Sequence, residues 1–401
     1  MDVIKHVFAP RLMRYPRRVL LLNGVVRHAD AISRSLLLKY EALEQAFGRD
    51  IRVDVAAYQI EDGIPNAHNV SSMLELIGLE AFREAEVLIY EFGIFYELFD
   101  SIRFAPPNAR KMAVWHNITP PGLAADFEGR ALLERSIGQL SNMLACDRVI
   151  CDSEFNAFEL DGLGFDPRRI SVLPLPASHR LLSAGAKPHH SANEPLRLLF
   201  VGRFVPAKGA LDLIRALGRL RQVGPQDIEL SLVGNLGFSR AAYIGEIREE
   251  MAKLPFRVQF LGTLDEDCLA REFLAADILV MPSYHEGYCL PVLEAFAAGC
   301  HVIAYAAGNL PAIVGQYGHL VRTGDLERLA CALSDCILER RAAIAEGREP
   351  TFRTGLGRIS ERRRRYEVRR YAAAFSESAY AEGFLMEMAE ALTAASISGI
   401  S

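Results

Sequence analysis

The sequence has few cysteines, and they are not arranged in pairs. Seven cysteines are scattered through 401 residues, with no C-x-x-C pair and no Cys/His cluster at zinc spacing. This excludes a zinc module, and an odd, dispersed set of thiols favours a reduced, cytoplasmic setting. The sequence also lacks a run of about eighteen uncharged apolar residues and, at its N-terminus, a continuous apolar core with a cleavage site. We therefore expect a cytoplasmic protein that is neither secreted nor membrane-spanning.

An excess of positive charge is missing as well. The formal net charge is -5, whereas proteins that bind nucleic acid usually carry a basic field or stripe, so we expect no nucleic-acid partner. The one strong basic run, RISERRRR at 358–365, is typical of a solvated helix face. Near the N-terminus Arg11, Arg14, Arg17 and Arg18 interleave with apolar residues. This segment suits a peripheral contact with an anionic membrane surface, and the alternative is a basic lead-in to the first strand.

The apolar residues suffice for two domains. Hydrophobic residues make up 50% of the chain and charged residues 24%, and a chain of this length is expected to divide in two. In both halves short apolar runs alternate with amphipathic helical patterns, which predicts an α/β fold with parallel sheets covered by helices. The expected strands are VLLLN (19–23), IRVDVAAY (51–58), VLIYEF (87–92), KMAVWHN (111–117), RVICDS (148–153), ISVLPLP (170–176), RLLFVG (197–202), IELSLVG (228–234), VQFLG (258–262), DILVMP (277–282), HVIAY (301–305) and GHLV (318–321).

The boundary between the domains is expected near the middle of the chain. Residues 183–195, SAGAKPHHSANEP, are rich in small, polar and proline residues and carry no periodic apolar pattern, which is typical of a linker. We therefore predict an N-terminal domain at 1–182 and a C-terminal domain at 196–370, both doubly wound and Rossmann-like. Two such domains would face each other across a cleft at the carboxyl ends of their strands, where open α/β sheets bind ligands.

A nearly apolar stretch of the second domain, HEGYCLPVLEAFAAGC at 285–300, keeps two carboxylates, Glu286 and Glu294. The turn after DILVMP is expected to lead into a helix with Pro291 at its first position, Glu294 in its first turn and Gly299 just past its end. We predict an anion site at the start of this helix. Its ligands would be a closely approaching backbone at Gly287 and the N–H groups of Tyr288, Cys289 and Leu290.

Two carboxylates flanking an anion site suit a ligand with hydroxyl pairs at both ends and phosphate in the middle. A nucleotide sugar has that shape. The alternative is that Glu294 only complements the helix dipole and Glu286 is solvated, each effect contributing less than about 1 kcal/mol. A second set, in FVGRFVPAKG at 200–209, places Gly202, Arg203 and Lys208 after the first strand of this domain. Its two cations could neutralise a diphosphate leaving group, or they could be ordinary loop cations.

These motifs resemble, in order and spacing, a known family: the retaining glycosyltransferases of the GT-B fold, family 4 (glycosyl transferases group 1). The matching strings are RLLFVGRFVPAKG, LSLVGN, VQFLGTL, AADILVMPSYHEGYCLPVLEAFAAGCHVIAY and RTGDLERLACAL in the second domain, with NGVVRHADAI, AVWHNITPP and DRVICDSEFNAFEL in the first. The string HNITPP resembles the mannosyltransferase-like branch that builds bacterial surface polysaccharides, in which many members use GDP-mannose. The resemblance also implies that the final helix, within 371–401, crosses back to the N-terminal domain.

The resemblance assigns roles to particular residues. Glu294 is expected to bind the ribose hydroxyls and Glu286 the donor hexose, while Arg203 and Lys208 hold the diphosphate. His116, at the end of the fourth strand, matches the family's first-domain histidine that contacts the transferred sugar, although a lone histidine is more often structural. His116 and Glu286 are therefore the expected catalytic residues. The acceptor is expected to be a saccharide or a lipid-linked saccharide, bound by the first domain at the cytoplasmic face of the membrane.

Departures from the family pattern concern the loop after the first strand, which has one glycine in GVVRHAD, and Cys289, which replaces a common glycine. No aspartate pair is placed to hold a metal, because DED at 265–267 is expected to cap a helix, so we predict neither metal nor cofactor. No carboxylate stands out as a nucleophile, which favours front-face transfer with retention. The alternatives are a nucleotide-sugar 2-epimerase of the same fold and a non-catalytic nucleotide-sugar-binding protein.

Overall fold

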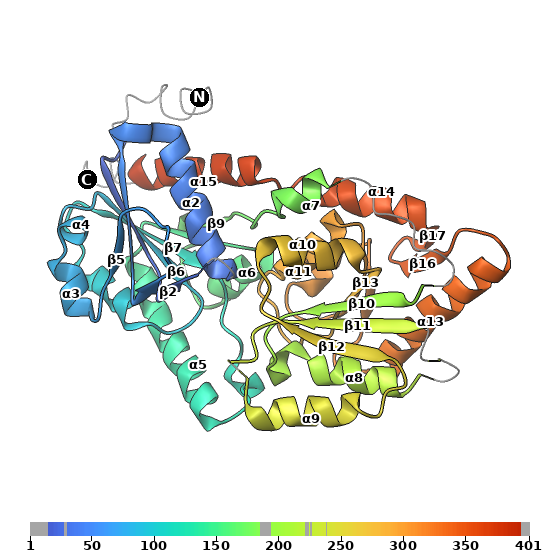
Figure 1. Ribbon diagram of the computed structural model, residues 1–401. Helices are drawn as coiled ribbons and strands as arrows, with labels where there is room; N and C mark the ends of the chain where they lie inside the picture. The colour runs from blue at the N-terminus through green and yellow to red at the C-terminus, as the bar shows by residue number, and fades with distance from the viewer. Residues whose placement is uncertain are drawn as a thin grey trace. The chain divides into compact units, whose positions relative to one another are not determined.

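The structure is a computed structural model that describes residues 15–27, 30–184, 194–220, 224, 227–237 and 239–393. The chain divides into two compact units (Figure 1). The first unit comprises the described residues of Met1–Pro121, Phe127–Pro176 and Glu377–Ser401, and the second those of Gly122–Asp126 and Ala177–Ser376. Among the described residues no helix combines the length and the apolarity needed to cross a membrane.

The first unit is built on a seven-stranded parallel sheet with the order β5-β3-β1-β6-β7-β8-β9. Its strands are β1 (Arg18–Leu22), β3 (Arg52–Ala57), β5 (Ala67–Asn69), β6 (Val87–Phe92), β7 (Arg110–Trp115), β8 (Arg148–Cys151) and β9 (Ile170–Val172), and β2 (Val25–Val26) pairs separately with β4 (Gln59–Ile60). Every residue of β6 is buried, as expected of a central parallel strand covered on both faces. Except for the short β2, β4 and β5, these strands lie within or beside the apolar runs that predicted them.

The helices of this unit are α2 (Ala31–Phe47), α3 (Met73–Gly78), α4 (Glu80–Arg83), α5 (Phe127–Gln139), α6 (Glu154–Gly162) and α15 (Glu377–Thr393), with 3-10 turns η2 (Gly48–Asp50), η3 (Glu97–Phe104), η4 (Pro121–Leu123), η5 (Leu140–Ala145) and η6 (Pro167–Arg169). The last helix, α15, packs on α2 and contacts β7 and β8 of the sheet. Ion pairs fasten it there, from Arg34 to Glu377 at 3.2 Å and from Arg148 to Glu387 at 2.6 Å and to Glu390 at 2.8 Å. Helix α15 is thus part of the first unit.

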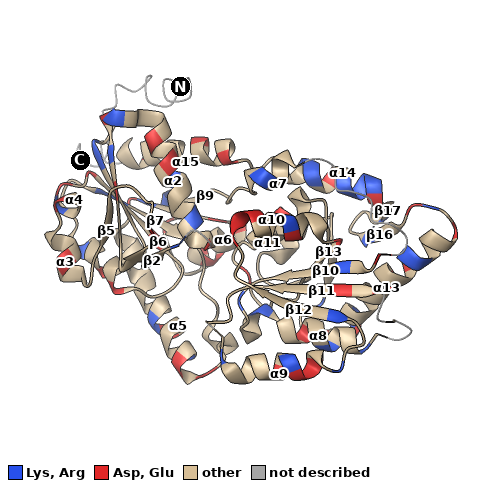
Figure 2. Cartoon of the chain, viewed as in Figure 1, with Lys and Arg blue, Asp and Glu red and all other residues tan. Residues whose placement is uncertain are grey.

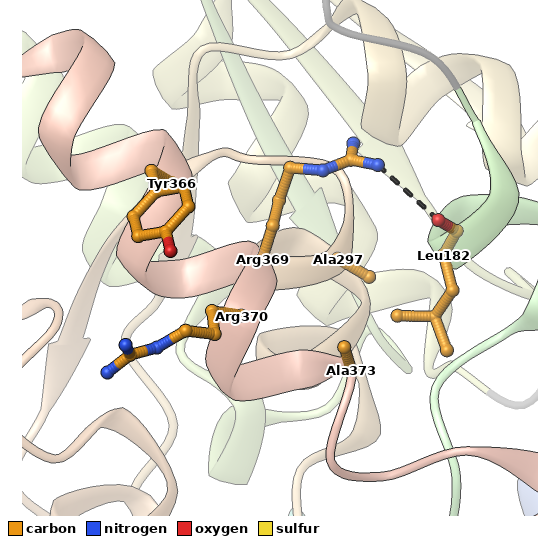
Figure 3. A pocket seen from close by; sticks show the side chains of 6 residues that line it. All are labelled: Leu182, Ala297, Tyr366, Arg369, Arg370 and Ala373. Atoms are coloured by element: carbon orange, nitrogen blue, oxygen red, sulfur yellow. Dashed lines mark hydrogen bonds between the residues drawn. The ribbon is translucent and has the colours of Figure 1, made fainter.

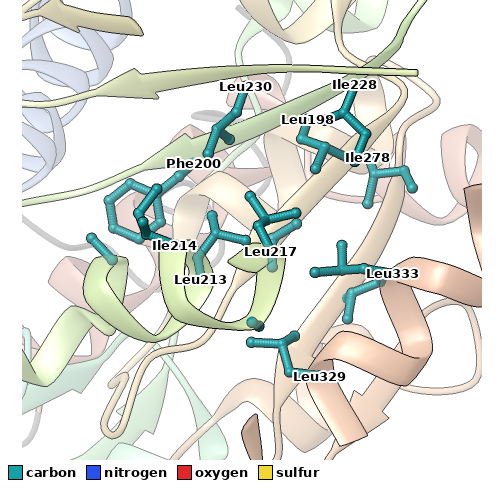
Figure 4. Packing of buried hydrophobic residues seen from close by; sticks show 14 of the residues in the cluster. Leu198, Phe200, Leu213, Ile214, Leu217, Ile228, Leu230, Ile278, Leu329 and Leu333 are labelled. Atoms are coloured by element: carbon teal, nitrogen blue, oxygen red, sulfur yellow. The ribbon is translucent and has the colours of Figure 1, made fainter. Parts of the chain in front are cut away.

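The second unit contains a six-stranded parallel sheet with the order β12-β11-β10-β13-β14-β15. Its strands are β10 (Leu196–Val201), β11 (Ile228–Val233), β12 (Arg257–Gly262), β13 (Ile278–Met281), β14 (His301–Tyr305) and β15 (His319–Val321), and its helices are α7 (His179–Ser183), η7 (Pro206–Lys208), α8 (Ala210–Gly218), α9 (Ala241–Met251), α10 (Glu266–Ala275), α11 (Leu290–Ala297), α12 (Leu310–Val314), α13 (Leu326–Ala345) and α14 (Glu361–Ala372). In its core, leucine and isoleucine side chains of α8 and α13 form one buried cluster with apolar side chains of β10 and β11 (Figure 4). Both units are therefore doubly wound α/β structures, as predicted.

Two predictions about this unit differ from the structure. The chain leaves the first unit after Pro176 and returns to it at Glu377, so α7 belongs to the second unit, and residues 185–193 of the predicted linker lie outside the described residues. The basic run 358–365 is not one solvated helix face. Its first three residues belong to a hairpin of β16 (Thr351–Thr354) and β17 (Gly357–Ser360), and α14 begins at Glu361.

Figure 2 shows the basic residues along α14. One of them, Arg364, is only 1% exposed. Its guanidinium lies over the ring of Phe352, 4.7 Å from the centroid, and donates to the carbonyl of Gly299 at 3.0 Å. The hairpin thus supplies a buried aromatic partner that the charge pattern of the sequence did not indicate.

Candidate functional site

The first feature of the site is an ion pair in the second unit. Lys208, at the end of η7, places Nζ 2.7 Å from Oε1 of Glu286, which lies in the loop after β13. The two side chains are 17% and 9% exposed, so the pair is largely withdrawn from water. The residues meet because β10 and β13 are adjacent parallel strands, whose carboxyl ends lie at the same edge of the sheet.

Close packing of backbone fixes this arrangement. The Tyr284 N–H donates to the carbonyl of Ala207 at 2.8 Å, which ties the loop after β13 to η7. Gly209 has φ +68, and a Cβ atom there would lie 1.9 Å from the Pro282 oxygen. Only glycine allows the turn that carries Lys208 to approach β13 this closely.

A third loop supports Glu286 from the side of β14. The Asn309 N–H donates to the Glu286 carbonyl at 2.8 Å, and the Asn309 side chain donates to the Tyr288 carbonyl at 3.0 Å. Gly308 has φ +55, and a Cβ atom there would lie 2.4 Å from the Glu286 oxygen. Sequence reasoning missed this support, although a glycine–asparagine pair shortly after a strand is a recognisable turn signal.

Helix α11 differs from the prediction in its first residue and in the position of Glu294 along it. It begins at Leu290, so Pro291 is its second residue, and Glu294 is its fifth residue and lies beyond the first turn. The reason is Cys289, whose φ of +73 turns the chain into the helix from a left-handed conformation. That conformation explains why glycine is common at this position of the family. The predicted end is confirmed, because Gly299 has φ +77 and its N–H donates to Phe296 at 2.9 Å.

The remaining predicted donor residues lie on these loops and on α11. Glu294 is buried, with 7% exposure. Gly202 directly follows β10, and its N–H donates to the Val233 carbonyl at 2.9 Å. Arg203 is exposed, and among the described residues its side chain makes no ion pair. Gly287 follows Glu286 in the loop that leads into α11. The structure thus brings Lys208 and Glu286 into contact and leaves Arg203 facing solvent.

His116 lies in the first unit, directly after β7, and belongs to a buried chain of charges. Its Nδ1 is 2.7 Å from Oδ2 of Asp152, and its Nε2 is 2.7 Å from Oε2 of Glu91. Glu91 in turn accepts from the ammonium of Lys39 at 3.0 Å. The four side chains are 0–4% exposed. Sequence reasoning missed Lys39, Glu91 and Asp152, although the two carboxylates stand at the ends of predicted strands.

The electrostatics of this chain make His116 a cation. Burial lowers the pKa of His116, but the charges and hydrogen bonds of Asp152 and Glu91 outweigh it and raise the pKa to about 9. Burial likewise opposes the charges of Lys39 and Glu91, yet their attraction raises the pKa of Lys39 to about 12 and lowers that of Glu91. Two cations and two anions therefore balance in the interior. Both ring nitrogens of His116 donate to carboxylates, so a sugar can bind a ring nitrogen only if one of these bonds breaks.

The described residues contain no group of three or more histidine, cysteine, aspartate or glutamate side chains that could hold a metal. The DED cluster serves the predicted purpose, because the Asp265 side chain caps α10 by accepting from the Cys268 N–H at 2.7 Å. The predicted independence from metal ions stays a prediction.

A cavity of about 290 Å³ lies at the other end of α11 (Figure 3). It is lined by Leu182, Ala297, Tyr366, Arg369, Arg370 and Ala373. None of the predicted donor residues borders it, and the Arg369 guanidinium is already engaged with the carbonyls of Leu182 and Ala184. This cavity is therefore separate from the candidate site.

Comparisons with known proteins bear on the family and the fold. Residues 195–339 match the model of the family described as Glycosyl transferases group 1. A D-inositol 3-phosphate glycosyltransferase of Nocardia farcinica is 30% identical over 292 residues, which are 69% of this chain and 60% of the relative. The chain spans about half the length of the curated relatives it matches.

Solved structures resemble the chain over nearly its whole length. Sucrose-phosphate synthase from Thermosynechococcus elongatus matches with a TM-score of 0.63 and 22% identity, covering 91% of this chain and 96% of the other. Anabaena HepE, solved in complex with UDP and glucose, matches with a TM-score of 0.64 and 16% identity over 92% and 98% of the two chains. The two Rossmann-like units define a GT-B fold. Within this fold, the match to the glycosyl transferases group 1 lies in the second unit.

Proposed function

We propose that this protein transfers a hexosyl unit from a nucleoside-diphosphate sugar to a saccharide or lipid-linked saccharide acceptor. The observation that carries the proposal is the buried Lys208–Glu286 pair, which lies beside the start of α11 in a domain matched by the family model. A cation next to a carboxylate that can accept from two hydroxyls suits the junction between diphosphate and sugar. The two named relatives that act on or bind sugars support the same class of ligand.

In the proposed reaction the donor lies on the second unit. Glu294 accepts from the ribose hydroxyls, Glu286 from the hexose hydroxyls, and Lys208 and Arg203 neutralise the diphosphate. The Lys208 ammonium has three N–H donors, so it can bind phosphate while it keeps its bond to Glu286. Backbone N–H groups of Tyr288, Cys289 and Leu290 complete the anion site at the start of α11, with Gly202 and Gly287 giving the ligand close access.

The chemical step we propose is front-face transfer with retention. The bond between the anomeric carbon and the phosphate oxygen breaks, a bond to the acceptor oxygen forms on the same face, and the leaving phosphate oxygen takes the acceptor's proton. The protein contributes positioning and charge neutralisation. His116 remains the proposed first-domain contact of the transferred sugar. Because its ring is held between two carboxylates, we expect it to act as a fixed cation.

We further propose that the donor is GDP-mannose and that the product enters a bacterial surface polysaccharide. Neither metal nor cofactor takes part in the proposed reaction, since Lys208, Arg203 and the start of α11 supply the positive charge. The alternatives are a nucleotide-sugar 2-epimerase and a non-catalytic binding protein. One experiment distinguishes the proposed transferase from these two alternatives. The pure protein is incubated with GDP-mannose, UDP-glucose and UDP-N-acetylglucosamine, with and without a lipid-linked saccharide. Proton NMR should show a transferred sugar that keeps its anomeric configuration, whereas epimer formation or unchanged donors would contradict the proposal.

The proposed cellular setting is the cytoplasmic face of the membrane, where the acceptor would be anchored. The structure bears on only part of the basic segment that suggested this setting. Arg11 and Arg14 lie outside the described residues, and Arg18 pairs with Glu80 at 2.7 Å and Glu84 at 3.0 Å. Flotation with anionic and neutral liposomes tests the proposal: the protein should float only with anionic vesicles and be released by salt.

A further inference from the structure

A carboxylate outside the predicted donor set links the elements that carry Lys208 and Glu286. Asp212 lies in the first turn of α8. Its Oδ2 accepts from the hydroxyl of Tyr284 at 2.7 Å and from that of Tyr305 at 2.9 Å. Both phenols donate to the same oxygen. Asp212 thus joins α8 to the loop after β13, which holds Tyr284, and to the end of β14, which holds Tyr305.

The same elements carry the two residues of the Lys208–Glu286 ion pair. Lys208 lies four residues before Asp212 on the turn into α8, and Glu286 lies two residues after Tyr284. Tyr284 is held at both ends, because its backbone N–H donates to Ala207 at 2.8 Å and its hydroxyl to Asp212. A shift of this tyrosine would therefore move the loop that carries Glu286 relative to the turn that carries Lys208.

The two tyrosines are well suited to remain donors. Burial and the neighbouring carboxylate raise the pKa of Tyr284 to about 12 and raise that of Tyr305 further above its usual value. Their rings meet edge to face, with centroids 5.6 Å apart. A Cβ atom on Gly324 would lie 3.5 Å from the Tyr284 hydroxyl, so the ring is also confined on that side. These contacts restrict the movement of the Tyr284 ring and keep its hydroxyl within reach of Asp212.

We propose that Asp212 is a positioning residue of the donor site, which holds the Glu286 loop against the Lys208 turn through the hydroxyl of Tyr284. The expected effect on sugar transfer rests on the proposed function. The expected effect on the position of the Glu286 loop rests on the hydrogen bonds alone. In the part of the chain that the structure describes, Asp212 forms no hydrogen bond or ion pair with Lys208 or Glu286, so it acts through the tyrosine. Because a single oxygen accepts both bonds, the amide oxygen of asparagine can replace it, whereas alanine cannot.

The test compares Asp212→Ala, Asp212→Asn and Tyr284→Phe with Tyr317→Phe, the same loss of a hydroxyl at a ring that packs against Phe296, near the C-terminal end of α11, and Tyr371 of α14. For donor transfer we expect Asp212→Ala and Tyr284→Phe to lower kcat/KM by about tenfold, most of it as a raised donor KM. Asp212→Asn should stay within about threefold of wild type, and Tyr317→Phe should not change. A role confined to stability would lower the melting temperature of Asp212→Ala without changing the kinetics of the folded protein.

A second readout needs no ligand. Hydrogen exchange followed by mass spectrometry reports the Tyr284 amide, which donates to Ala207 in the free protein. In Asp212→Ala the peptide containing residues 282–288 should exchange at least about fivefold faster, and in Asp212→Asn it should not. Unchanged exchange in Asp212→Ala would overturn the inference, as would equal effects of alanine and asparagine. If wild type transfers no sugar while exchange responds as expected, the proposed function fails and the positioning role stands.

Discussion

The buried cation at His116 can be tested by the dependence of stability on pH. The structure gives His116 a pKa of about 9, with both ring nitrogens bound to carboxylates, whereas a histidine in an unfolded chain has a pKa of about 6.5. A pKa that folding raises means that the folded protein binds the proton more tightly. The resulting stability is fully present below about pH 6.5 and is lost as the pH rises through about 9.

The size of the effect follows from the two pKa values. Each pH unit between them corresponds to about 1.4 kcal/mol, so the first unit should lose on the order of 3 kcal/mol between pH 6.5 and pH 9.5. His116→Gln removes the titrating group. The variant should be less stable than wild type by a similar amount at pH 6.5, and the gap should shrink to less than about 1 kcal/mol at pH 9.5.

The chain provides its own probe for this experiment. Trp115 is the single tryptophan, is 3% exposed and lies in β7 beside His116. Its fluorescence during urea unfolding therefore reports the first unit. His68→Gln, at another histidine of this unit that bonds a carboxylate, is the control and should keep the wild-type decline. Parallel curves for wild type and His116→Gln across this pH range would refute the buried imidazolium.

Other predictions concern the second unit. Lys208→Ala should lower transfer by at least about tenfold without unfolding the protein, since it removes a charge-assisted contact worth about 1.5–3 kcal/mol; normal kinetics would remove Lys208 from the donor site. Transfer should survive excess EDTA, and a loss restored by Mn²⁺ would show that the charge assignment is wrong. Burial and the nearby Arg364 lower the pKa of His301 well below its usual value, and its ring nitrogens have no partner among the described residues. Stability should therefore fall as the pH drops below about 6.5, and thermal melting should show His301→Leu to be the more stable protein at pH 5 by at least about 1 kcal/mol.

The sequence predicted the sheets better than the contacts at their edges. Apolar runs located the long strands because central parallel strands are buried on both faces. The meeting of Lys208 with Glu286 was predictable in outline, since both follow strands whose ends share one edge. The partners of His116 were not, because strand order decides which side chains become neighbours: β6 and β8 flank β7 and bring in Glu91 and Asp152.

Local backbone geometry accounts for the smaller differences. The start of α11 moved by one residue because Cys289 adopts a left-handed conformation, which no propensity predicts for cysteine. The hairpin at 351–360 was missed because its strands are short and charged. The burial of Arg364 was missed for the same reason, because the aromatic ring over which it lies belongs to the hairpin.

The central claim is that the loop and helix bearing Glu286 and Glu294 form a nucleotide-sugar site. Titration calorimetry with GDP and UDP, using wild type and Glu294→Gln, tests it most directly. Glu327→Gln, an exposed residue on α13, is the matched control. We predict that wild type binds one of the two nucleotides, that Glu294→Gln binds it at least about tenfold more weakly, and that the control binds as wild type does. Equal affinity of wild type and Glu294→Gln, or no binding of either nucleotide by wild type, would contradict the claim.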